Sequence, residues 1–123
     1  MNYTLLFAVA AVAAWLMFRG SAGATPDTDR AWATIDKGAL LIDVRSDAEY
    51  REGHLEGAVN IPHTETERLV AVAGSDKGRA VVVYCRSGRR SGMAQAALAA
   101  AGYTNVLNGG AFDRLQSSRP RTR

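Results

Sequence analysis

The chain has 123 residues and a formal net charge of +3, with 47% hydrophobic and 22% charged residues. This composition excludes an intrinsically disordered chain and one embedded entirely in a membrane, and the length allows one small domain. Three arginines lie in a basic tail at residues 118–123, but no basic face interleaved with aromatic side chains is present, so nucleic acid is not an expected partner.

The first segment of the chain is apolar. Residues 3–18 carry no charged side chain, and at about 1.5 Å per residue the run is slightly shorter than a hydrocarbon core. We predict that residues 1–20 form an apolar helix that anchors the protein in a membrane through a single pass, followed by a linker at 21–25. Cationic residues follow the run and none precede it, which favours a cytoplasmic domain. Small residues around Ala24 support the alternative, a cleaved signal peptide and a periplasmic domain.

A helix is predicted after the linker, at residues 25–38. Thr25 supplies a capping side chain, Pro26 suits the first turn, and Gly38 stops the helix. Residues 39–44 then form a continuous apolar run of strand length.

The next segment contains a capping box. Ser46 followed three residues later by Glu49 predicts one short helical turn, which Gly53 ends. A brief strand at residues 58–62 and a helix at 64–74 are expected to follow.

Residues 79–85 are the most strand-like segment, because β-branched side chains run through it. A helix at residues 91–102, a short strand at 105–108 and a terminal helix at 111–118 complete the chain. Strands that alternate with helices predict an α/β fold with a central, mostly parallel sheet of four to five strands, covered by helices on both faces.

Cys85 is the single cysteine and stands at the carboxyl end of the strand at residues 79–85, where ligands bind in open α/β sheets. The basic loop from Arg86 to Arg90 leads into a helix N-terminus, where free N–H groups and the helix dipole favour an anion. A fall of about two units in the thiol pKa makes such a side chain mostly thiolate at neutral pH. The residues therefore indicate a nucleophilic cysteine, against the alternative of a small buried hydrophobe.

Three stretches of the sequence resemble the rhodanese-like sulfurtransferase family. They are LIDVRSDAEYREGHLEGAVNIP at residues 41–62, VVVYCRSGRRS at 81–91 and AGYTNVLNGGAF at 101–112. The resemblance is closest to small single-domain bacterial members with an N-terminal membrane anchor or signal sequence. It implies a rhodanese-like fold over residues 26–117, and it places the anchored form in the bacterial inner membrane.

The resemblance also implies a two-step transfer of sulfur. Cys85 would take the outer sulfur of thiosulfate or a similar small anionic donor, and the persulfide would pass it to cyanide or a thiol, including a thioredoxin-like protein. Backbone N–H groups of the substrate-binding loop would cradle that sulfur; the loop residues are Arg86, Ser87, Gly88, Arg89 and Arg90. No cofactor and no metal are implied.

Three further residues match motifs of the family and are expected to support the site. Asp43 and Arg45 match an Asp-x-Arg motif that would brace the loops beneath it. His54 matches the Gly-His pair of the first motif and is expected to act as a structural hydrogen-bonding residue. One position departs from the family, because Arg114 stands where many members have a tryptophan, and its apolar neighbours are expected to take over the packing.

Two alternatives remain open at this point. A cysteine phosphatase or arsenate reductase, which has a related fold, needs an arginine six positions after the nucleophile, and Ser91 is found there. A non-catalytic binding module would use the same fold only as an interaction surface, although family members of that kind often lack the cysteine.

Overall fold

The computed structural model describes residues 28–120. The predicted anchor at 1–20, the linker at 21–25 and the capping residues of the first helix lie outside this range, as do the last three residues of the tail. Within the described part of the chain, no helix is long and apolar enough to cross a bilayer.

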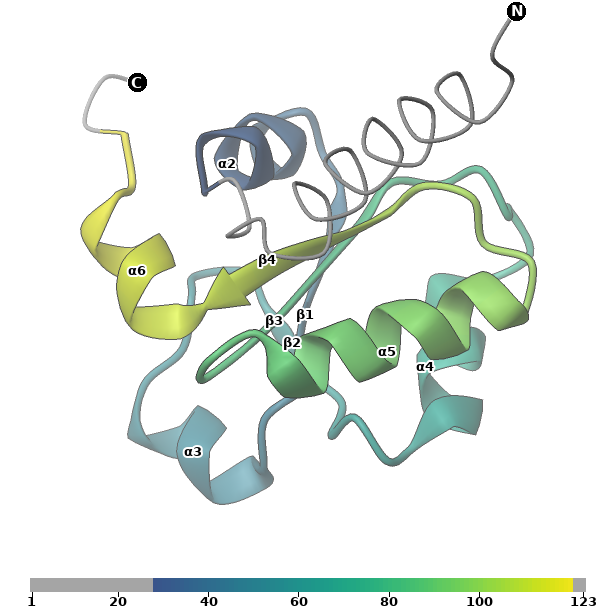
Figure 1. Ribbon diagram of the computed structural model, residues 1–123, viewed down its shortest axis with the longest axis horizontal. Helices are drawn as coiled ribbons and strands as arrows, with labels where there is room; N and C mark the ends of the chain where they lie inside the picture. Colours follow the sequence, from purple (N-terminus) through teal and green to yellow (C-terminus); the bar gives the residue numbers. More distant parts are fainter. Residues whose placement is uncertain (1–27, 121–123) are drawn as a thin grey trace, which may run out of the picture.

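A four-stranded parallel sheet forms the centre of the fold, in the order β2-β1-β3-β4 (Figure 1). The strands are β1 (Leu40–Asp43), β2 (Val59–Asn60), β3 (Val81–Cys85) and β4 (Val106–Ala111). The helices are α2 (Thr28–Asp36), α3 (Asp47–Glu52), α4 (Thr66–Ala73), α5 (Arg89–Ala100) and α6 (Phe112–Ser117). The predicted α/β fold with a parallel sheet is confirmed, and β3, which carries the cysteine, has a strand on each side.

The alternation of side chains along β3 builds one core on each face of the sheet. Val81, Val83 and Cys85 belong to the core beneath α4 and α5, whereas Val82 and Tyr84 belong to the core beneath α2 and α6. All five side chains are fully buried. A strand buried on both faces is apolar throughout, which is why this segment is so easily recognised in the sequence.

Strand β4 extends to Ala111, three residues beyond its predicted end. Its pairing with β3 shifts after Val83, and this bulge leaves Gly109 without a partner on β3. A Cβ atom at Gly109 would lie 3.1 Å from Val82 Cγ1 and 3.3 Å from the Val83 carbonyl oxygen. A side chain at this position would require Val82 or the backbone of Val83 to move, so the bulge favours glycine, and the strand carries the chain on to α6.

Helix α6 shows how the fold accommodates the arginine at the family's tryptophan position. Arg114 is exposed, whereas the next residue, Leu115, is fully buried. The Leu115 carbonyl accepts a hydrogen bond of 2.9 Å from Trp32 Nε1 of α2. Leu115 therefore supplies the packing at this end of the domain, as expected for an apolar neighbour.

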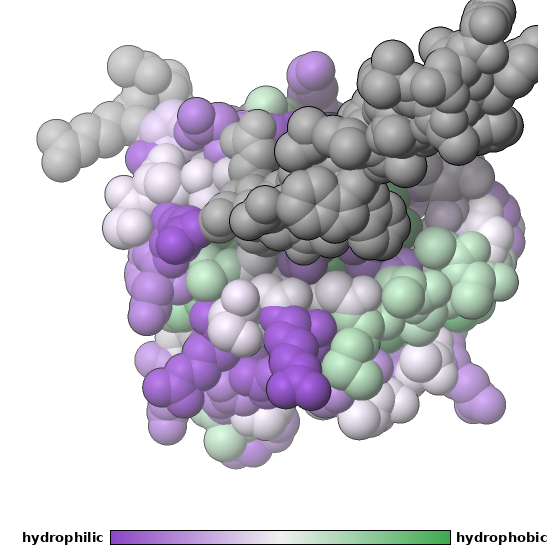
Figure 2. Space-filling view, viewed as in Figure 1, coloured by the Kyte–Doolittle hydropathy of each residue, from purple (hydrophilic) through white to green (hydrophobic). Residues whose placement is uncertain are grey.

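The outer face of α5 is apolar, and Figure 2 shows hydrophobic surface over this helix. Its exposed residues include Met93, Ala96, Ala99 and Ala100. Alanine has the highest intrinsic helix propensity, so this composition stabilises α5 although its N-cap, Gly88, provides no side-chain hydrogen bond. The first N–H groups of the helix are therefore left for another acceptor.

Candidate active site

The loop after β3 wraps around the sulfur of Cys85. Gly88 has a φ of 98°, a left-handed conformation that favours glycine, and this turn starts α5 directly afterwards. The helix begins at Arg89, two residues earlier than predicted. Arg89 and Arg90 therefore lie in the first helical turn, and the loop itself consists of residues 86–88.

Three hydrogen-bonding groups lie against Cys85 Sγ. The backbone N–H of Gly88 donates at 3.0 Å, the N–H of Ser91 donates at 3.3 Å, and the Ser91 hydroxyl oxygen lies 3.3 Å away. Ser91 is the third residue of α5, whose N–H is usually satisfied by the side chain of the N-cap. Because the N-cap, Gly88, has no side chain, Cys85 Sγ accepts the hydrogen bond from the Ser91 N–H instead.

The surroundings of Cys85 act on its pKa in two directions. Burial of the thiol is the largest influence and raises the pKa. The Ser91 hydroxyl and the backbone N–H groups of Ser91, Ser87 and Gly88 together outweigh burial, so the pKa of Cys85 lies below its ordinary value. The site can therefore hold a sulfur anion without exposing it to water.

Asn108 on β4 orients the groups around the sulfur. Its Oδ1 accepts hydrogen bonds from the Ser91 hydroxyl at 2.7 Å and from the Gly110 N–H at 3.0 Å, and its Nδ2 donates to the Gly88 carbonyl at 3.1 Å. The Ser91 hydroxyl has one proton and two acceptors within reach, Asn108 Oδ1 and Sγ. Sequence reasoning identified neither Ser91 nor Asn108 as a site residue, although the place of Ser91 in the first helical turn after the cysteine was a usable signal.

Ser91→Ala is expected to raise the pKa of Cys85, because it removes the hydroxyl group that lies 3.3 Å from the charged sulfur. The wild-type thiolate persists until the pH falls through its lowered pKa, so the pH at which reactivity is lost should be higher in the variant. The rate of alkylation by iodoacetamide, measured against pH by intact mass, checks this. Ser87→Ala removes an exposed side chain and keeps the N–H, so it should retain the wild-type profile. Identical profiles for all three proteins would contradict the role of the hydroxyl.

Arg90 pairs with Glu49 of α3 and does not stand free in the loop. Two hydrogen bonds of 2.7 and 3.0 Å join the guanidinium to the carboxylate. The hydrogen bond from Arg90 lowers the pKa of Glu49 to about 2. The predicted capping box is present, because Glu49 also binds the N–H of Ser46 at 3.1 Å. The pair therefore holds α3 against the start of α5.

This ion pair is expected to make the stability of the domain depend on pH. The folded-state pKa of Glu49 lies below the unfolded value of about 4.3, so its contribution is present above that value and is lost as the pH falls toward about 2. Glu49→Gln should lower the free energy of unfolding by about 1–2 kcal/mol at pH 7 and by much less near pH 2. Urea unfolding of wild type, Glu49→Gln and the exposed control Glu67→Gln between pH 2 and 7 measures this. A constant difference across that range would contradict the assignment.

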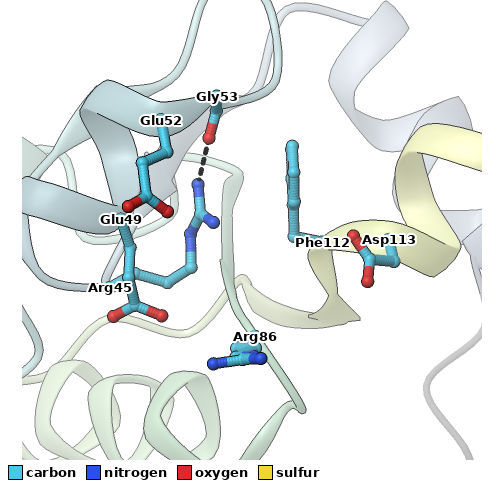
Figure 3. Close-up of a pocket in the computed structure, with 7 residues that line it drawn as sticks. All are labelled: Arg45, Glu49, Glu52, Gly53, Arg86, Phe112 and Asp113. Atoms are coloured by element: carbon cyan, nitrogen blue, oxygen red, sulfur yellow. Dashed lines mark hydrogen bonds between the residues drawn. The ribbon is translucent and has the colours of Figure 1, made fainter.

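The Asp-x-Arg pair forms a buried network beside the end of β3. Asp43 accepts hydrogen bonds from Arg45 Nη2 at 2.7 Å, from the Arg45 backbone N–H at 2.9 Å and from the Tyr84 hydroxyl at 2.8 Å. Arg45 Nη2 also donates to the Gly53 carbonyl at 2.6 Å, and its guanidinium carbon lies 4.3 Å from the centroid of the Phe112 ring (Figure 3). Because Tyr84 directly precedes the cysteine, this network fixes the strand that carries the sulfur.

The remaining predicted site residues lie on the surface. Arg86, Ser87 and Arg89 are exposed. His54 follows α3; its Nδ1 lies 2.8 Å from the Tyr50 carbonyl oxygen, and the two rings stack with centroids 3.7 Å apart. The hydrogen bond that the structure gives His54 is therefore local to α3.

A pocket of about 300 Å³ opens beside the loop. Figure 3 shows Arg86 on the side of the loop, Glu52 and Gly53 at the end of α3, and Phe112 and Asp113 at the start of α6. Arg45 and Glu49 complete the lining. The pocket thus joins three elements at the carboxyl edge of the sheet.

The chain is similar to known proteins in sequence and in fold. The model of the rhodanese-like domain family matches residues 27–113. Thiosulfate sulfurtransferase PspE of Escherichia coli (strain K12) is 46% identical over 69 residues, which cover 56% of this chain and 66% of that protein. The thiosulfate:glutathione sulfurtransferase of Saccharomyces cerevisiae is 29% identical over 91 residues, which cover 65% of this chain and 66% of that protein. The match therefore spans slightly less than two thirds of each of these relatives.

Two solved structures share the fold. A rhodanese with anions from E. coli superimposes with a TM-score of 0.58 at 37% identity, covering 70% of this chain and 95% of that one. The human single-domain sulfurtransferase TSTD1 gives a TM-score of 0.64 at 25% identity, covering 78% of this chain and 97% of that one.

Proposed function

Since the chain belongs to the rhodanese-like domain family, we propose that it is a sulfurtransferase that uses thiosulfate or a similar sulfane donor, with Cys85 as the sulfur carrier. The observation that carries the proposal is the pair of backbone donors around Sγ, the N–H groups of Gly88 and Ser91, with the Ser91 hydroxyl oxygen 3.3 Å away. Such donors stabilise a sulfur anion in a buried site, which a merely structural cysteine does not need.

In the first step the Cys85 thiolate attacks the outer sulfur of thiosulfate. A bond forms between Sγ and that sulfur, and the S–S bond of thiosulfate breaks with its electron pair leaving on sulfite. The product is a persulfide on Cys85 with a negative charge on its outer sulfur. Sulfite is a stable anion, so its departure needs no proton from the protein, and the work of the site is to stabilise sulfur anions.

In the second step an acceptor takes the outer sulfur. Cyanide or a thiolate attacks it, the bond to Sγ breaks, and the electron pair returns to Cys85 as a thiolate. A thioredoxin-like protein thiol is an acceptor of the same chemical class as a small thiol. The two steps restore the enzyme without a cofactor.

Two exposed arginines beside the sulfur are expected to attract the dianionic donor. Arg86→Gln/Arg89→Gln should raise the KM for thiosulfate by about three- to tenfold at low salt, and raised ionic strength should mimic the change in the wild type. The kinetics with an uncharged sulfane donor should stay the same. Arg79→Gln, an exposed arginine before β3, is the matched control. Equal losses with both donors would contradict electrostatic steering.

Intact mass after incubation with thiosulfate tests the proposed function. We expect a gain of one sulfur atom, which cyanide removes with release of thiocyanate. Prior alkylation with iodoacetamide is a complete control, because the chain has one cysteine. No gain in mass and no thiocyanate would instead favour the non-catalytic binding module.

We also propose that residues 1–20 anchor the domain to the cytoplasmic side of the bacterial inner membrane. The support is the uncharged run at residues 3–18 and the cationic residues that follow it. Protease accessibility in spheroplasts, combined with N-terminal sequencing, tests this, and we expect a protected domain with its original N-terminus. A new N-terminus near Ala24 and an accessible domain would instead show a cleaved signal.

A further inference from the structure

The pocket beside the loop is lined by charged side chains of both signs. Among residues 28–120, the exposed side chains of Arg86, Glu52 and Asp113 make no hydrogen bond or ion pair. The two other charged residues of the lining differ, because Arg45 is bound by its buried network and Glu49 by the arginine of α5. The pocket therefore offers one guanidinium and two carboxylates to a solute.

These three charges surround the pocket from different elements. Figure 3 shows Arg86 at the loop after β3, Glu52 at the end of α3 and Asp113 at the start of α6. In Figure 3 the half-buried ring of Phe112 stands between Asp113 and the side chain of Glu52, with the Arg45 guanidinium against it. A complementary ligand carries an ammonium group for the carboxylates, a carboxylate for the guanidinium, and a short apolar part for the ring. A volume of about 300 Å³ suits an amino acid or a short peptide.

The pocket also adjoins the loop that surrounds the reactive sulfur. Arg86 directly follows Cys85 in the chain and lines the pocket. Glu49, which lines it from α3, holds Arg90 in the first turn of α5. A molecule in the pocket therefore lies against the same loop that holds the sulfur.

We propose that this pocket is the acceptor subsite for small amino-acid-derived thiols, which carry an ammonium and a carboxylate group on the same molecule as the thiol. The inference rests on the proposed function, because these thiols would be the acceptors of its second step. The acceptor thiolate attacks the outer sulfur of the Cys85 persulfide and forms a new S–S bond. The bond to Sγ breaks, its electron pair stays on Sγ, and no outside oxidant or reductant takes part.

The choice of acceptor tests the subsite. With thiosulfate as donor, L-cysteine carries both charged groups, N-acetyl-L-cysteine lacks the ammonium group, and cyanide is too small to fill the pocket. Glu52→Gln/Asp113→Asn is expected to raise the KM for cysteine by about three- to tenfold, as is typical for two exposed charges. The KM for N-acetylcysteine should not rise, so the ratio of the two KM values should change. Glu67→Gln, which removes an exposed charge on α4, is the matched control.

A second measurement does not depend on turnover. S-methyl-L-cysteine keeps both charged groups but has no thiol, so it binds without reacting. Titrated into the ¹⁵N-labelled protein, it is expected to shift the amide resonances of Gly53, Arg86 and Asp113 in the wild type and to shift them less in the double variant.

The outcomes separate the two proposals. If the persulfide forms and cyanide discharges it, the proposed function holds. An unchanged KM for cysteine in the double variant would then overturn the subsite alone, whether or not the resonances shift. A protein that gains no sulfur from thiosulfate would overturn the proposed function and the acceptor role with it.

Discussion

Cys85→Ala is expected to abolish both steps of sulfur transfer while the domain remains folded. The variant has no atom that can form a bond to the sulfane sulfur, so the gain in mass from thiosulfate and the release of thiocyanate should both fall to background. Cys85 is fully buried in the core beneath α4 and α5, and its truncation leaves only a small cavity, which costs about 1 kcal/mol. Intact mass, a thiocyanate assay and thermal unfolding measure the three quantities on one preparation.

Cys85→Ser distinguishes the chemistry of sulfur from the shape of the site. A serine oxygen at this position can still accept hydrogen bonds from the N–H groups of Gly88 and Ser91, but its hydroxyl is not ionised at neutral pH and carries no persulfide. We expect stability within about 1 kcal/mol of the wild type and no transfer. Thiocyanate formation above that of buffer in either variant would mean that another group carries the sulfur, and would contradict the proposed mechanism.

The elements of the fold were predictable where their signals are local. The apolar run at residues 79–85 and the capping box at Ser46 and Glu49 depend on neighbouring residues. The capping box is found where it was predicted, and the strand spans Val81–Cys85, within the predicted run. The end of β4 was not predictable in this way, because the bulge at Gly109 depends on how two strands pair. Strand order is a long-range property too, so the hydrophobic pattern alone did not determine it.

The residues of the candidate site were likewise predictable only where they are neighbours in the sequence. The sequence places Cys85 and its glycine and arginines in one short stretch, so the nucleophile and its loop could be predicted together. Asn108 and Glu49 come from other elements and are brought to the loop only by the fold. Within the predicted loop, Arg90 forms an ion pair with Glu49, whereas Arg86 and Arg89 are exposed.

Asp43→Asn is expected to destabilise the domain by about 3–5 kcal/mol, the largest stability effect among these predictions. Arg45 is only 6% exposed, and its guanidinium would keep its charge in the interior with no anionic partner in the network. The Tyr84 hydroxyl would also exchange a carboxylate acceptor for a neutral amide. Equilibrium urea unfolding measures the loss, and a value below about 1 kcal/mol would contradict a buried, mutually dependent pair.

The matched variants are Arg45→Met and Asp43→Asn/Arg45→Met. Removing both charges avoids an unpaired ion, so the double variant should be more stable than the sum of the two single losses predicts. Activity divided by the concentration of folded protein distinguishes a structural role of Asp43 and Arg45 from a role in the reaction. Because the hydrogen bond from Tyr84 links Asp43 to the residue before Cys85, the alkylation profile of the folded Asp43→Asn protein should keep the midpoint of the wild type. A clear shift of the midpoint would mean that the buried carboxylate acts on the thiolate itself, and the Asp-x-Arg pair would then belong to the reaction as well as to the fold.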